Sequence, residues 1–136
     1  PDKYPYVLTT YRLTEHHAAG MSRHVPWLSE LFFGHFAEIG TEMAKELGIQ
    51  NGDMLTVETP RAKIKVQALV TERIKPFIIN GKKVYQVGIP WHWGYQGVMK
   101  SARGDITNDL VASLGDPTTF IQESKALLCN VRKGVA

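Results

Sequence analysis

The chain has 136 residues, of which 43% are hydrophobic and 21% are charged, and its formal net charge is +3. This composition is typical of one soluble globular domain, and no apolar run reaches the roughly 18 residues of a membrane-spanning helix. The single cysteine, Cys129, excludes an internal disulfide and a thiolate iron–sulfur or zinc site. Its alternation with apolar residues predicts a buried strand position rather than a reactive thiol.

Strands are predicted wherever β-branched, aromatic or alternating apolar residues run between turn signals. They cover residues 6–11, 36–39, 54–57, 62–70, 77–79, 84–87 and 126–132. The dipeptide Asn80-Gly81 is a strong hairpin signal between 77–79 and 84–87. The stretches 90–97, 105–110 and 113–119 are expected to be loops or turns.

Two short helices are predicted between these strands. Thr41 is expected to be an N-cap, with Glu42 in the first turn and Gly48 as the C-terminal stop. A second short helix is expected over Pro26–Leu31. Six or seven strands with one or two short helices indicate a barrel or other closed sheet.

Charge is unevenly distributed along the chain. Residues 61–103 hold nine Lys and Arg against one acid, Glu72, whereas residues 36–60 hold five acids and one base. A basic middle segment suits an anionic partner such as phosphate, nucleic acid or an acidic protein surface. The alternative is a solvated, lysine-rich strand face that protects an edge.

The first predicted strand ends in a series of polar residues, where scaffolds often present ligand contacts. An arginine there could clamp a phosphate or carboxylate, and hydroxyl, amide and imidazole groups could add donors. The candidate ligand contacts are Thr10, Arg12, Leu13, His16 and His17. The alternative is that Glu15 pairs with Arg12 while the histidines face solvent.

A metal site at Glu15-His16-His17 is disfavoured, because adjacent histidines in an extended chain point in opposite directions. We predict no metal ligand in the chain.

Three further segments carry candidate ligand residues. Trp91, His92 and Trp93 lie in an aromatic loop that could stack on a flat ring or fill the core. The Asn108 amide could meet a base edge or ribose, or belong to a turn. Lys125 could reach a phosphate or simply face solvent.

Signatures of chemistry are missing from the sequence. It contains no Walker loop, no strand-associated GxGxxG, no nucleophile elbow and no evident carboxylate pair. We therefore predict no catalytic residue and expect a domain that holds an anionic ligand.

Four stretches together resemble the C-terminal domain of molybdopterin-dependent oxidoreductases, most closely that of formate dehydrogenase catalytic subunits. They are Tyr11–His17, residues 36–40 with 44–53, Val87–Gly97, and Ile106–Asn108 with Glu123–Lys125. The third stretch, which contains PWHWGYQG, is the one most similar to formate dehydrogenases. The resemblance extends from Tyr4 to Lys133.

This resemblance implies a mainly β fold, a six-stranded double-psi β-barrel, in which residues 1–136 form one C-terminal domain of a larger prokaryotic enzyme, periplasmic or cytoplasmic. It implies that the domain caps bis(molybdopterin guanine dinucleotide), carrying molybdenum or tungsten, through the ten candidate residues named above. The partners implied are the remaining domains of the catalytic subunit, with an iron–sulfur cluster, and an iron–sulfur electron-transfer subunit.

The metal's own ligands lie in earlier domains of such enzymes, so the chain alone is expected to be inactive and to carry no bound cofactor. Neither nucleic acid nor direct membrane insertion is expected. Two alternatives remain: the same domain of a relative such as nitrate reductase, and a freestanding barrel that binds nucleic acid or protein through residues 61–103.

Overall fold

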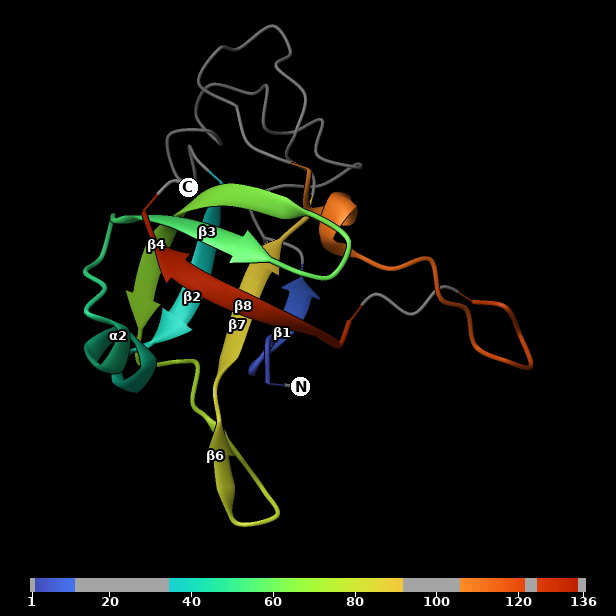
Figure 1. Cartoon of the computed structure of the whole chain (residues 1–136), viewed down its shortest axis with the longest axis horizontal. Helices are drawn as coiled ribbons and strands as arrows, with labels where there is room; N and C mark the ends of the chain where they lie inside the picture. Colours follow the sequence, from blue (N-terminus) through green and yellow to red (C-terminus); the bar gives the residue numbers. More distant parts are fainter. Residues whose placement is uncertain (1, 12–34, 92–105, 122–124, 135–136) are drawn as a thin grey trace, which may run out of the picture.

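Eight strands and two short helical segments form the computed structural model, which describes residues 2–11, 35–91, 106–121 and 125–134 (Figure 1). The strands are β1 (Tyr6–Tyr11), β2 (Phe36–Gly40), β3 (Met54–Glu58), β4 (Lys63–Thr71), β5 (Phe77–Ile79), β6 (Lys82–Val84), β7 (Gln86–Pro90) and β8 (Leu127–Lys133). The helical segments are α2 (Thr41–Leu47) and the 3-10 turn η2 (Thr107–Leu110).

Six of these strands close into a barrel in the order β1-β7-β2-β4-β3-β8. Strands β1 and β7 pair in parallel, as do β2 and β4, while the remaining neighbours in the barrel are antiparallel. Closure removes the exposed edges of the barrel sheet. The predicted fold class, a mainly β six-stranded barrel, is confirmed.

The barrel is filled by every second residue of its strands. On β4 the buried Ile64, Val66 and Ala68 alternate with exposed polar residues, as the sequence pattern predicts. Cys129 is fully buried on β8. Burial raises the pKa of its thiol to about 12, so the prediction of a core cysteine is confirmed and a reactive thiolate is excluded.

The helix α2 begins one residue earlier than predicted. Its N-cap is Gly40 rather than Thr41, and no side chain caps it. A Cβ on Gly40 would lie 2.3 Å from the main-chain oxygen of Ile74, so only glycine fits where these two segments meet. Its end at Gly48, with φ of 64°, is as predicted.

The hairpin prediction is correct in its turn and wrong in its second strand. Asn80 and Gly81 both have positive φ, as their two-residue turn requires. The turn places Lys82 opposite Ile79, so β6 covers Lys82–Val84 rather than residues 84–87. Gln86 and Val87 belong instead to the barrel strand β7. The hairpin stands apart from the barrel (Figure 1).

The predicted helix over residues 26–31 lies outside the described residues. Within the described ranges, no helix combines the length and the hydropathy needed to cross a membrane.

Candidate functional site

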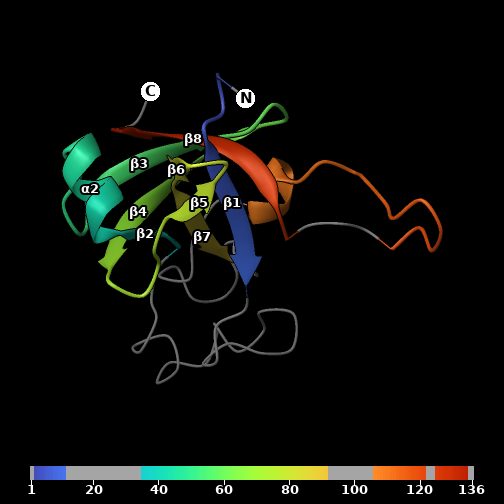
Figure 2. The same ribbon diagram turned by 90° about the horizontal axis from the view of Figure 1, so that it is seen from below.

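The candidate site is built at the edge of the barrel where the parallel strands β1 and β7 both end (Figure 2). Thr10 pairs with Ile89 and Tyr11 with Pro90. The amide of Trp91 then donates to the carbonyl of Tyr11 at 2.9 Å, which extends the ladder by one residue. The main chain that leads to Arg12 is thus fixed beside the main chain that enters the predicted aromatic loop at Trp91, which we call the tryptophan loop.

Lys125, from the segment before β8, reaches this same edge. Its Nζ donates to the main-chain carbonyl of Thr10 at 3.3 Å and lies 5.5 Å from the centre of the Trp91 ring. The Thr10 side chain itself faces the barrel interior and is 2% exposed. Three of the predicted site residues therefore meet, with an ammonium group held between a carbonyl and an aromatic face.

Asn108 is brought to the same edge by its neighbour, Thr107. The buried Thr107 hydroxyl donates to the carbonyl of Pro90 at 2.9 Å, which ties η2 to the end of β7. The Nε2 of His35 lies 3.0 Å from the same hydroxyl oxygen. Because the hydroxyl proton is directed at Pro90, Nε2–H must be the donor in that pair. Asn108 is left exposed beside the start of the tryptophan loop.

The other predicted site residues lie outside the described residues. They are Arg12, Leu13, His16, His17, His92 and Trp93. The same holds for the disfavoured metal site at residues 15–17.

A buried carboxylate on the outer face of the barrel was not anticipated from the sequence. Glu38 on β2 is 1% exposed. The Tyr11 hydroxyl donates to Oε2 at 2.7 Å, the Thr71 hydroxyl donates to Oε1 at 3.0 Å, and Arg73 donates to both oxygens at 2.8 and 2.5 Å. We call these four residues the Glu38 network. A lone acid within the apolar strand Phe36–Gly40 was the only signal for it.

The charge of Glu38 is balanced by these donors. Burial raises the pKa of its carboxyl, but the hydrogen bonds from Arg73, Tyr11 and Thr71 outweigh burial, and the pKa falls below its ordinary value of 4.5. Burial and the hydrogen bond to Glu38 raise the pKa of Tyr11 above its ordinary range. Glu38 is therefore a permanently charged acceptor at neutral pH.

Gly88 makes the Glu38 network possible. Tyr11 lies on β1 and Glu38 on β2, and β7 runs between these two strands. A Cβ on Gly88 would approach the Tyr11 ring to 2.8 Å. The ring can therefore cross β7 only over glycine, and through this crossing the end of β1 is fixed against β2.

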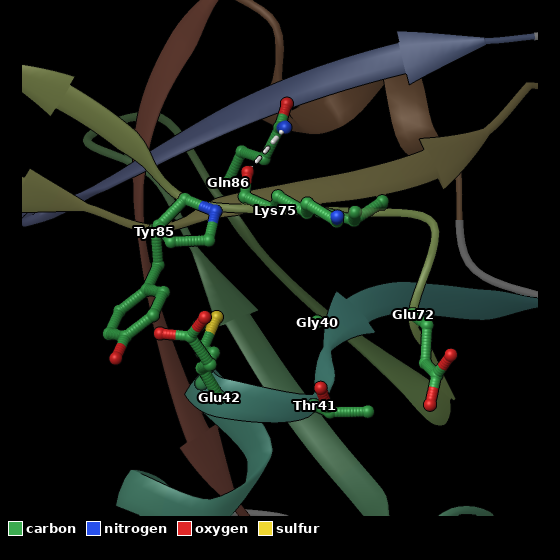
Figure 3. A pocket seen from close by; sticks show the side chains of 10 residues that line it. Gly40, Thr41, Glu42, Glu72, Lys75, Tyr85 and Gln86 are labelled. Atoms are coloured by element: carbon green, nitrogen blue, oxygen red, sulfur yellow. Dashed lines mark hydrogen bonds between the residues drawn. The ribbon is translucent and has the colours of Figure 1, made fainter.

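A pocket of about 320 Å³ lies at the opposite end of β7, between the start of α2 and residues 72–76 (Figure 3). The Gln86 amide donates to the Lys75 carbonyl across it at 2.8 Å. None of the predicted site residues lines this pocket. Its lining carries two carboxylates, Glu42 and Glu72, and one ammonium group, Lys75, so it offers an anion no excess of positive charge.

The uneven charge along the chain is partly neutralised within the fold. Bases of the 61–103 segment pair with acids of the 36–60 segment, in the ion pairs Lys63–Glu58, Arg73–Glu38 and Lys83–Glu42. The basic segment therefore does not present its full charge to an outside partner.

The chain is similar to known proteins in sequence and in fold. Residues 6–128 match the family described as the molydopterin dinucleotide binding domain. The chain is 46% identical to the formate dehydrogenase subunit alpha of Megalodesulfovibrio gigas over 96% of its own length and 13% of that protein. It is 46% identical to the formate dehydrogenase-O major subunit of Escherichia coli, over 97% of this chain and 13% of that protein.

A more distant relative is a nitrate reductase of Symbiobacterium thermophilum, 31% identical over 98% of the chain and 16% of that protein. Among solved structures, acetylene hydratase from Pelobacter acetylenicus shares the fold with a TM-score of 0.74 at 15% identity, over 98% of this chain and 19% of that one. The chain thus spans about an eighth of the length of the formate dehydrogenase subunits that it matches.

Proposed function

The chain belongs to the molybdopterin dinucleotide binding domain family, and from this premise we propose that it caps bis(molybdopterin guanine dinucleotide) at the barrel edge where β1 and β7 end. The observation that carries this proposal is the meeting of Lys125, Trp91 and Thr10 at that edge. Three segments far apart in sequence supply these groups.

The chemistry of these residues fits the dinucleotide. The ammonium group of Lys125 suits a phosphate oxygen, and the exposed Asn108 amide offers a donor and an acceptor to a base or ribose. The Trp91 ring offers a flat face for stacking. We extend the site to Arg12, Leu13, His16 and His17, which follow Tyr11 in sequence, and to His92 and Trp93, which follow Trp91.

The role of the chain is to hold and orient. When bound, the cofactor supplies a molybdenum or tungsten centre for oxidation of the substrate. The chain's own residues neutralise phosphate charge and satisfy polar edges that would otherwise be buried unpaired, each at a cost of roughly 1–3 kcal/mol. Positioning by a rigid barrel is the contribution expected of such a domain.

We further propose that the parent enzyme oxidises formate to carbon dioxide and passes electrons to an iron–sulfur cluster in its other domains and then to an iron–sulfur subunit. The higher identity to formate dehydrogenases, 46% against 31% for the nitrate reductase, supports formate over nitrate. The neutralising ion pairs weigh against nucleic-acid binding.

Titration with guanosine diphosphate, monitored by calorimetry, tests the site. The loss of one charge-assisted hydrogen bond in Lys125→Ala should weaken binding by about tenfold or more. Lys82→Ala, at the far end of the molecule, is the matched control and should leave the affinity unchanged. Equal affinity in wild type and Lys125→Ala would remove the basis of the proposal.

A further inference from the structure

The hairpin β5–β6 is built as a projection rather than as part of the barrel. Its two strands pair only with each other, and it extends away from the barrel at the amino end of β7 (Figure 1). Three consecutive apolar residues on β5 are exposed: Phe77, Ile78 and Ile79 are 44%, 69% and 48% accessible to solvent. An isolated two-stranded hairpin is only marginally stable in water, so this one would gain from a partner that covers it.

A groove of about 510 Å³ continues this apolar surface onto the barrel. Tyr4 and Tyr6 from the start of the chain line it, together with Ile79 and Tyr85. Leu128 of β8, 46% exposed, also lines it. Ile79 belongs to both the hairpin and the groove, and Phe77 lies on the same face of β5, whereas Ile78 lies on the opposite face. Exposed apolar surface of this kind marks sites of protein association.

The rim of the groove determines which partner chemistry would suit it. Lys82 and Lys83 line it, against one acid, Asp2. Lys83 is paired with Glu42 at 2.7 Å, whereas no carboxylate within the described ranges forms an ion pair with Lys82. A partner segment that carries a carboxylate beside apolar side chains would complement both features.

The location of the hairpin indicates which polypeptide supplies that segment. The proposed cofactor edge lies at the carboxyl end of β7. If the proposed function holds, on which this step rests, that edge faces the rest of the catalytic polypeptide. The hairpin leaves from the other end of the same strand. Relatives of the chain are named as the alpha or major subunit of their enzymes. We propose that the hairpin and groove dock an acidic, apolar, extended segment of a separate subunit.

Zero-length carbodiimide coupling tests this proposal on the native complex that contains the chain. The reagent joins lysine amines to carboxylates in direct contact, and the Lys83–Glu42 pair provides an internal positive control. We expect Lys82 to be coupled to an Asp or Glu of a different polypeptide, flanked by apolar residues. Coupling of Lys82 only within its own polypeptide, or no coupling while the control forms, would overturn the proposal.

A double variant, Phe77→Ser with Ile79→Ser, at residues that are 44% and 48% exposed on one face of β5, provides a second test. Loss of two exposed apolar anchors should weaken retention of the separate subunit by about tenfold or more. Leu114→Ser, at a residue that is 61% exposed away from the hairpin, is the matched control. Unchanged retention in the double variant would refute the docking role. Cofactor content should stay at the wild-type level, so failure of the proposed cofactor site would be seen separately.

Discussion

Replacement of Glu38 by alanine tests how the end of β1 is held. The change removes four hydrogen bonds from the Glu38 network. Hydrogen bonds to a charged group contribute about 1.5–3 kcal/mol each when buried. Arg73 is 72% exposed at its side chain and would recover water, so its share is discounted. Folding of the variant also avoids the cost of desolvating a carboxylate, which offsets part of the lost hydrogen bonding. The net expectation is a loss of about 3 kcal/mol in the free energy of unfolding.

Urea denaturation at pH 7 measures this loss. Glu42→Ala, which breaks an exposed ion pair with Lys83, is the control and should leave the unfolding free energy within experimental error. A loss below about 1 kcal/mol in Glu38→Ala would refute the reasoning, because it would mean that the buried network is no stronger than a surface pair.

The contribution of Glu38 should also depend on pH in a defined direction. The pKa of its carboxyl is lowered in the folded state from an ordinary value of 4.5. The stabilising effect of Glu38 is therefore complete above pH 4.5. It is lost as the pH falls through the lower pKa that the carboxyl has in the folded state. The stability difference between wild type and Glu38→Gln should shrink below pH 4.5. A constant difference down to strongly acidic pH would contradict the assignment.

Two further substitutions and one labelling experiment have defined outcomes. Gly88→Ala should displace the Tyr11 ring and lower the thermal midpoint by several degrees, while an unchanged midpoint would show that the strands shift freely. Thr107→Val removes the bond to Pro90 and should cost about 1–2 kcal/mol in urea unfolding; a cost near zero would contradict a fixed η2. Cys129 should react with a thiol reagent only on the timescale of unfolding, and rapid labelling of the native protein would contradict its burial.

The fold was largely predictable because its strands are rich in β-branched, aromatic or alternating apolar residues and are bounded by turn signals. The pattern over residues 62–70 predicts one buried face, and the turn residues at 80–81 predict the hairpin. The Gly40 N-cap could not be predicted, since it depends on the approach of Ile74, which is distant in sequence. Strand β6 was misplaced because Val84–Val87 is as apolar as a strand, and only pairing register separates β6 from β7.

The sequence proposes the residue types of the candidate site but not the contacts that support them. The chemistry of Lys125 and Asn108 made them candidates, but only the family resemblance favoured a ligand role, since an exposed lysine or a turn asparagine has no distinguishing pattern alone. Glu38 and Thr107 act through partners 17 to 72 positions away in sequence. Such contacts exist only once the barrel closes, so local spacing cannot reveal them.

The position of the dinucleotide is the central claim, and amide chemical-shift mapping during titration with guanosine diphosphate tests it most directly. We predict that the largest changes fall on Thr10, Trp91, Asn108 and Lys125. Changes confined to the pocket around Gly40, at the other end of β7, would contradict the account.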